Sequence, residues 1–182
     1  MRVIAGKYKR RNLKGPKHEG LRPTADRVKE ALFNIIGVKV DGADLLDLFA
    51  GTGSIGIEAL SRGANSVVFS DSNAASIKIL RENLTILDPN EQVRVIPFPA
   101  ERTLELLSKE GTRFDLIFLD PPFQAGLLPK TIDSIVAKKL LKNDGILAVE
   151  HPKQISVSHS ELNLYLGRNY GDINLSFFQK IN

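Results

Sequence analysis

The stretch Asp47-Leu-Phe-Ala-Gly-Thr-Gly-Ser-Ile-Gly56 decides the fold of this chain. It begins within the apolar run 45–49 and spells G-x-G-x-x-G through Gly51, Gly53 and Gly56. Without Cβ atoms the backbone can turn sharply and a ligand can approach its amides. A glycine loop between a strand and a helix is typical of a nucleotide-like cofactor site at the carboxyl edge of an open α/β sheet.

Outward from this loop, apolar segments alternate with amphipathic ones. We expect strands at 45–49, 66–70, 93–98, 114–119 and 145–150, and helices at about 54–62, 73–87, 101–109 and 127–141. Continuous apolar strands separated by helices favour a parallel, doubly wound sheet. The segments 161–167 and 172–180 flank 168–171 and predict a closing antiparallel hairpin. The expected fold class is α/β and Rossmann-like.

A basic extension precedes the sheet. The segments 2–6 and 10–13 predict a small β-hairpin. Pro23 is expected to lead into a helix with Thr24 as its N-cap and Gly37 at its end. One face of that helix is apolar, which leaves Arg27 and Lys29 free to point elsewhere. We expect a single domain over 1–182, made of the extension and helix at 1–37 and a catalytic core at 41–182.

Charge is distributed unevenly along the 182 residues. The net charge is +4, but residues 1–29 hold ten Lys and Arg against two acidic residues, a formal +8. Such a patch is the usual electrostatic footprint of a phosphate-rich partner, although a solvated tail would look the same. The rest of the chain is therefore mildly acidic.

Several classes of protein are excluded or disfavoured by composition. The chain has no Cys, which excludes disulfides and thiolate metal sites. Its three histidines show no metal-ligand spacing, so no metal is expected, and no G-x-S-x-G elbow of a serine hydrolase is present. No apolar stretch approaches the roughly 20 residues that span a bilayer. We expect a cytoplasmic protein without a membrane partner, and nothing requires more than a monomer.

Two acidic residues help to define the ligand of the glycine loop. Asp47 places a carboxylate beside the loop, where it would attract a cationic methionine moiety and repel a pyrophosphate. Asp71 ends the next strand, 20 residues after Gly51, and can accept hydrogen bonds from ribose hydroxyls. Asp71 suits either cofactor, so it is Asp47 that favours S-adenosylmethionine over a nicotinamide dinucleotide.

The second motif is Asp120-Pro-Pro-Phe123, which directly follows the apolar run 114–119. Two prolines remove backbone donors and fix φ near −65°, so they leave rigid carbonyl acceptors. Asp120 and the Pro121 carbonyl could accept the two N–H bonds of an exocyclic amine, and Phe123 could stack on its ring. We therefore expect methyl transfer to the amino group of a nucleobase.

The residues quoted above resemble the class I S-adenosylmethionine-dependent methyltransferases that act on amino groups of bases. Two N-terminal strings, Arg2-Val-Ile-Ala-Gly6 and Leu21-Arg-Pro-Thr-Ala-Asp-Arg-Val-Lys-Glu-Ala-Leu-Phe-Asn34, are more specific. They resemble the bacterial 16S ribosomal RNA guanine-N2 methyltransferase family of RsmD type. The resemblance implies a seven-stranded sheet, S-adenosylmethionine as methyl donor, and a guanine of 16S ribosomal RNA presented in the small subunit or its assembly intermediate.

The resemblance also implies roles for residues. The catalytic turn would be Asp120, Pro121, Pro122 and Phe123. The cofactor would lie against Thr24, Asp47, Phe49, Ala50, Gly51, Thr52, Gly53, Asp71, Ser72, Ala100 and Glu101. The RNA would meet Lys7, Lys9, Arg10, Arg11, Arg22 and Arg27.

One position departs from the family. Its members commonly carry Asp or Asn before the Ala that follows the third strand, whereas Pro99 precedes Ala100 here. We expect the Ala100 amide to bond the adenine ring, with Glu101 as a substitute acceptor.

Three alternatives remain open at this point. An adenine-N6 methyltransferase acting on DNA or RNA would use the same kind of turn, and only the N-terminal strings favour guanine. A nicotinamide-dependent oxidoreductase would use the glycine loop, although Asp47 opposes it. A non-catalytic RNA-binding protein would explain the basic patch alone.

Overall fold

A seven-stranded sheet with the order β3-β2-β1-β4-β5-β7-β6 forms the centre of the protein. The computed structural model describes residues 1–15, 23–122, 124 and 126–181, with the side chains of 23–25 outside that description. Strands β1 to β5 run parallel, and β7 is antiparallel to both β5 and β6. The predicted class is confirmed: a Rossmann-like α/β fold closed by an antiparallel hairpin.

The strands are β1 (Asp44–Leu48), β2 (Ser66–Ser70), β3 (Gln92–Ile96), β4 (Phe114–Leu119), β5 (Leu141–Pro152), β6 (Leu162–Tyr170) and β7 (Ile173–Lys180). The helices are α1 (Pro23–Ile36), the short 3-10 helix η1 (Gly37–Val40), α2 (Ser54–Ser61), α3 (Ala74–Leu84), α4 (Ala100–Lys109) and α5 (Leu127–Ala137).

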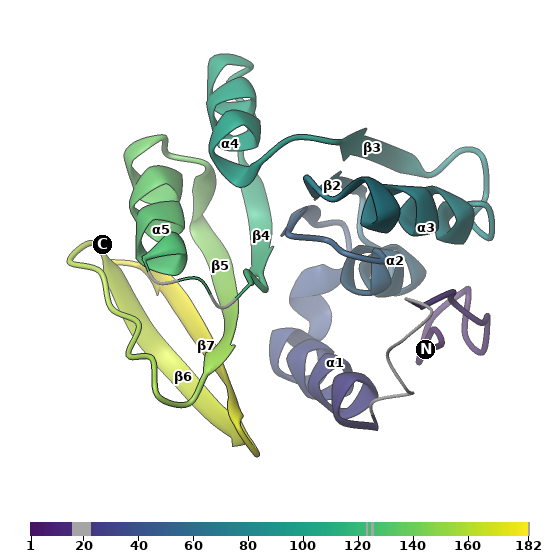
Figure 1. Ribbon diagram of the computed structural model, residues 1–182, viewed down its shortest axis with the longest axis horizontal. Helices are drawn as coiled ribbons and strands as arrows, with labels where there is room; N and C mark the ends of the chain where they lie inside the picture. The colour runs from purple at the N-terminus through teal and green to yellow at the C-terminus, as the bar shows by residue number, and fades with distance from the viewer. Residues whose placement is uncertain (16–22, 123, 125, 182) are drawn as a thin grey trace.

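Helices cover both faces of the sheet (Figure 1). Apolar residues of α1, α2 and α3 form one buried cluster with one face of the strands, and those of α4 and α5 form a second cluster with the other face. Phe118 and Ala148 belong to the first cluster, and Ile117 and Leu147 to the second, because side chains alternate across a strand. The carboxyl ends of β1, β4 and β5 therefore open beneath α1. In the described ranges, none of the helices is long and apolar enough to cross a membrane.

Several predicted boundaries are wrong, most clearly around α5 and in the closing hairpin. Helix α5 ends at Ala137, and β5 begins at Leu141, four residues before the predicted start at Gly145. Lys139 has a φ of 54° in the left-handed region and stops the helix, although Leu140 and Leu141 continue its apolar spacing. In the closing hairpin, β6 runs on to Tyr170, so the turn is shorter than the predicted 168–171.

The N-terminal segment forms a minimal version of the predicted hairpin. A single antiparallel bridge joins Arg2 to Asn12, and the Val3 amide donates to the Arg11 carbonyl at 2.9 Å. The predicted N-cap at Thr24 is wrong, because α1 begins one residue earlier at Pro23. Proline suits a first helical position, where its missing N–H would have no intrahelical acceptor.

Candidate active site

A cleft of about 1160 Å³ lies at the carboxyl edge of β1, β4 and β5. Its wall includes loop residues Phe49, Ala50, Gly51 and Thr52, all of them predicted cofactor contacts. Among the described residues, five acidic side chains also line it, against a single lysine, Lys29. They are Asp26, Asp47, Asp120, Glu150 and Asp172. The cleft therefore suits a ligand that carries positive charge and N–H donors.

The loop after β1 is held in an unusual backbone conformation. Phe49 has a φ of 71°, which is uncommon for a residue with a side chain, and Gly51 has a φ of 54°. The amides of Phe49 and Ala50 both donate to the Ser70 carbonyl at 2.9 Å. Asp71 fixes the tip, because its Oδ2 accepts the Gly51 amide at 2.8 Å. The loop is thus tied to the end of β2 on both sides.

Asp47 supports the loop from below. Only 1% of the residue is exposed, and its Oδ2 accepts the Gly56 amide in the first turn of α2 at 3.0 Å. Burial is the main cause that raises the pKa of Asp47 to about 7; the Gly56 hydrogen bond opposes this shift, and the Asp120 and Asp71 carboxylates add to it. A positive charge in the cleft would favour the ionised form of Asp47.

The proline turn begins where β4 ends. Leu119 pairs with Val149 of β5, so Asp120 and Glu150 are the next residues on adjacent strands. Asp120 is exposed to the cleft, whereas Pro121 is buried. Phe123, the predicted stacking residue, lies outside the described residues.

Glu150 is a cleft residue that our reading of the sequence missed. It lines the cleft beside Asp120. Burial, and secondly the Asp120 carboxylate, raise its pKa to about 8. A signal was present, since an acidic residue ends or directly follows each of the predicted strands 66–70, 114–119 and 145–150.

Some predicted cofactor residues lie elsewhere. The described lining of the cleft lacks five of the predicted cofactor residues, which are Gly53, Asp71, Ser72, Ala100 and Glu101. Asp71 is half-buried and holds the Gly51 amide of the cleft wall, and Ser72 and Glu101 are exposed. Pro99 is the N-cap of α4 and provides no side-chain cap. The side chain of Thr24 lies outside the description.

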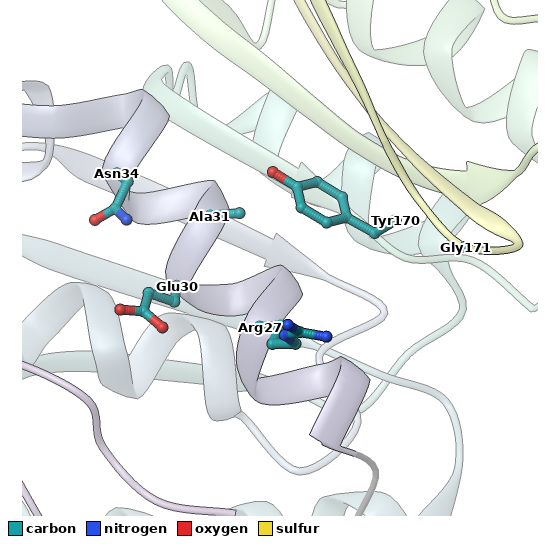
Figure 2. A pocket seen from close by; sticks show the side chains of 6 residues that line it. All are labelled: Arg27, Glu30, Ala31, Asn34, Tyr170 and Gly171. Atoms are coloured by element: carbon teal, nitrogen blue, oxygen red, sulfur yellow. The ribbon is translucent and has the colours of Figure 1, made fainter.

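A second, open groove of about 600 Å³ borders this cleft and shares Tyr170 and Gly171 with it. Figure 2 shows the Tyr170 ring extending from the hairpin turn toward α1, which contributes Arg27. Arg27 is exposed, as the RNA assignment requires. Arg22 lies outside the described residues.

The predicted RNA residues at the N-terminus differ in their surroundings. Lys9, Arg10 and Arg11 are exposed. Lys7 instead forms an ion pair with Glu91, and its ammonium lies 5.3 Å from the centre of the Tyr8 ring. Among these four predicted RNA residues, Lys7 is thus the one that forms a salt bridge within the described part of the chain.

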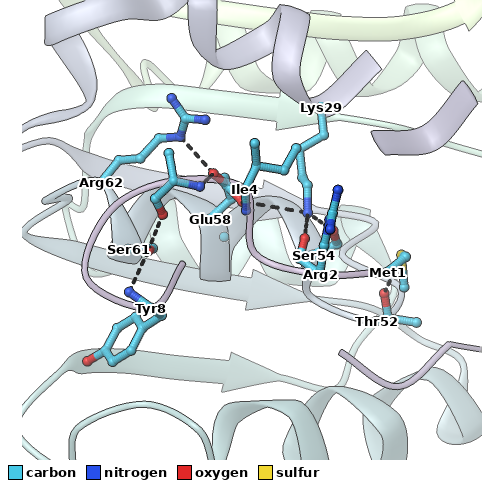
Figure 3. Close-up of polar contacts among 12 residues, drawn as sticks. Met1, Arg2, Ile4, Tyr8, Lys29, Thr52, Ser54, Glu58, Ser61 and Arg62 are labelled. Carbon is cyan, nitrogen blue, oxygen red and sulfur yellow. Dashed lines mark hydrogen bonds and ion pairs between the residues drawn. The ribbon is translucent and has the colours of Figure 1, made fainter. Parts of the chain in front are cut away.

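Lys29 is buried, so the expectation that it points away from the body is wrong. Its Nζ donates to the Arg2 carbonyl at 2.7 Å and to Ser54 Oγ at 3.0 Å, and it lies 3.6 Å from a Glu58 oxygen (Figure 3). Glu58, itself fully buried, also accepts the amides of Ile4 and Ala5. These bonds fasten the basic N-terminal segment to α2, next to the glycine loop.

The loop and the N-terminal segment are joined a second time through Asn83 of α3. Its side-chain amide donates to the carbonyls of Thr52 and Lys14, and its Oδ1 accepts the Lys14 amide at 2.7 Å. Met1 also lines the cleft. The basic segment therefore forms part of the cleft's rim.

This sheet order, with a glycine loop after β1 and an Asp-Pro-Pro turn after β4, defines a class I methyltransferase. In the part of the chain that the structure describes, no group of three or more His, Cys, Asp or Glu could hold a metal ion.

The chain belongs to the family described as Conserved hypothetical protein 95, whose model matches residues 1–179. It is 37% identical to Ribosomal RNA small subunit methyltransferase D of Escherichia coli (strain K12) over 150 residues, which cover 82% of this chain and 74% of the relative. The solved structure of yhhF from Escherichia coli is 32% identical, covers 99% of this chain and 97% of that chain, and has a TM-score of 0.88. The expected RsmD-type family is confirmed.

A more distant structure shares the fold. It is a Thermus thermophilus 16S rRNA N2 guanine methyltransferase, RsmC, in complex with AdoMet and guanosine. Its TM-score is 0.69 at 20% identity, and the match covers 91% of this chain and 45% of that chain.

Proposed function

We propose that this protein transfers a methyl group from S-adenosylmethionine to the N2 amino group of a guanine in 16S ribosomal RNA. The substrate would be the small ribosomal subunit or its assembly intermediate, and the enzyme would act as a cytoplasmic monomer. One observation carries the proposal: a cleft lined by five carboxyl groups opens beside the basic N-terminal segment. Its family relatives named as ribosomal RNA methyltransferases support the same reaction.

The residues present fit S-adenosylmethionine. When bound, the cofactor supplies an electrophilic methyl group on a positively charged sulfur. The carboxylates of Asp47 and Asp120 complement that charge, while they would repel the pyrophosphate of a nicotinamide dinucleotide. Loop residues 49–53 would hold the methionine part. Each Asp71 oxygen accepts one amide and retains capacity for a ribose hydroxyl.

The proline turn would orient the target amine. The lone pair of an exocyclic amine is delocalised into the ring, so the nitrogen is a weak nucleophile. Asp120 and the Pro121 carbonyl would each accept one N–H bond and turn the lone pair toward the methyl donor. Phe123 would stack on the base, a contact worth about 1–3 kcal/mol. Positioning supplies most of the catalysis in this scheme.

The RNA would lie across the basic segment and the adjoining groove. Four exposed cations would contact phosphates: Lys9, Arg10, Arg11 and Arg27. Lys7 would do so only if its ion pair with Glu91 opened. Phosphate contacts fix register and orientation rather than sequence. The selectivity for one base must therefore come from contacts inside the cleft.

Incubation with labelled S-adenosylmethionine and small subunits lacking the modification tests the proposal. Nucleoside mass spectrometry should find N2-methylguanosine, mapped to one position of the RNA. Methyladenosine as the sole product would favour the adenine-N6 alternative instead.

A matched variant separates catalysis from binding. Asp120→Ala should abolish methylation and leave the thermal stabilisation by S-adenosylhomocysteine in place, since Asp120 is exposed at the end of β4. Unchanged methylation by this variant would remove Asp120 from the catalytic assignment.

A further inference from the structure

We infer that Glu150 recognises the N1–H of the target guanine and so makes the cleft selective for guanine over purines that lack this proton. The inference rests on the function proposed above and assigns a base-reading residue to the same site.

The position of Glu150 in the sheet is the first support. The register Leu119–Val149 and Phe118–Ala148 places Asp120 and Glu150 side by side, directly after the last residue pair between β4 and β5. Adjacent strands lie about 4.8 Å apart, and both residues line the same cleft. In guanine the N1 and N2 nitrogens are bonded to the same ring carbon. Two carboxyl groups at this spacing can therefore accept from both nitrogens together.

The surroundings of Glu150 are the second support. Within the described part of the chain, no group donates a hydrogen bond to the Glu150 carboxyl, and the charge that acts on it is the like charge of Asp120. Burial and that charge raise its pKa to about 8. A half-buried acid beside another acid is unfavourable in the empty protein. An N–H donor in the cleft would relieve this cost.

The chemistry of the base edge gives selectivity. Guanine offers N1–H and the N2 amino group as neighbouring donors. Above pH 8 the Glu150 carboxyl is ionised, and the lone pair of the unprotonated N1 of adenine or 2-aminopurine would then face a carboxylate. A site built to pair with a donor rejects an analogue that lacks it, because a buried group stays unpaired. Asp120 alone would accept the amino group of any of these bases.

The test compares two substrates at pH 8.5, above the pKa of Glu150. The target guanine, once mapped, is replaced by 2-aminopurine in 16S RNA, which is then assembled into small subunits. 2-Aminopurine keeps the N2 amino group and loses N1–H, and its fluorescence reports entry into the cleft. Wild type should methylate guanine roughly 10- to 100-fold faster than 2-aminopurine. Glu150→Gln, whose amide can donate to an unprotonated N1, should narrow this ratio at least tenfold and bind the fluorescent base more tightly than wild type.

The controls separate the possible failures. Glu161→Gln, an exposed substitution outside the described cleft lining, should keep the wild-type ratio. Glu150→Gln should fold, because the side chain is isosteric and neutral where burial already disfavours charge. An unchanged ratio in Glu150→Gln would overturn the inference and leave the methyltransferase proposal standing. An equal loss on both bases would also overturn it. Absence of methylguanosine with wild type would refute the proposed function itself, and the inference with it.

Discussion

Removing the Glu58 carboxylate should be among the most damaging single changes to the stability of this protein. Glu58 is fully buried and neutralises Lys29, of which only 2% is exposed. Burial lowers the pKa of Lys29, and the Glu58 charge is the largest influence that opposes this shift. Glu58→Gln keeps the shape, removes the charge and leaves a lysine buried without a counter-ion.

The expected cost follows from the geometry. Breaking a buried ion pair by neutralising one partner costs about 3–5 kcal/mol, a large fraction of a typical free energy of unfolding. Part of this cost is the weakening of bonds from Ile4, Ala5 and the Arg62 guanidinium, all of which end on Glu58. For a chain of 182 residues the midpoint of thermal unfolding should fall by about 10 °C.

Urea denaturation at pH 7 measures this directly, with thermal unfolding as a second readout. Lys29→Met in the Glu58→Gln background should recover part of the loss, because the uncompensated charge is removed. Glu82→Gln, which breaks an exposed pair with Lys14, serves as the control and should leave the unfolding free energy unchanged within error. A Glu58→Gln variant as stable as this control, or strictly additive losses in the double variant, would refute the reasoning.

Three further predictions concern pH, the RNA surface and the glycine loop. The folded-state pKa of Glu150 is raised from 4.5 to about 8, so between these pH values the folded state holds a proton that the unfolded state has released, and stability should fall as pH rises. Thermal scans from pH 5 to 9 should show a smaller fall in Glu150→Gln than in wild type. An identical pH profile would contradict the assignment. Replacing the exposed cations Lys9, Arg10 and Arg11 together by alanine should reduce the slope of log K against log salt for RNA binding by about 2–3. A slope equal to that of wild type would exclude these residues from the RNA contact. Gly56→Ala would place a methyl group against the buried Phe69 ring. Calorimetry should therefore show weaker S-adenosylhomocysteine binding and a free energy of unfolding lower by about 1–3 kcal/mol. Binding and stability equal to wild type would mean that α2 can shift to accommodate the methyl group.

Local patterns were sufficient for the centre of the sheet. The strands at 66–70 and 114–119 have the predicted bounds, because each is a short, mainly apolar segment between polar or turn residues. The glycine loop and Asp120 were also found from sequence, since each directly follows such a run. Their meeting at one edge is a property of parallel strands rather than of any single residue.

Features that depend on distant partners were not accessible from sequence. Lys29 looked like a surface residue because its partners, Arg2, Ser54 and Glu58, belong to segments at least 25 positions away along the chain. Glu150 gains its significance only from the register that places it beside Asp120. The end of α5 was misplaced because the apolar spacing continues past the left-handed residue Lys139.

A crystal structure of the protein with S-adenosylhomocysteine tests the central claim most directly. The account predicts the thioether sulfur in the cleft beneath α1, against residues 49–52 and facing Asp120 across the ends of β1 and β4. The ligand bound anywhere else, with this cleft left empty, would contradict the account.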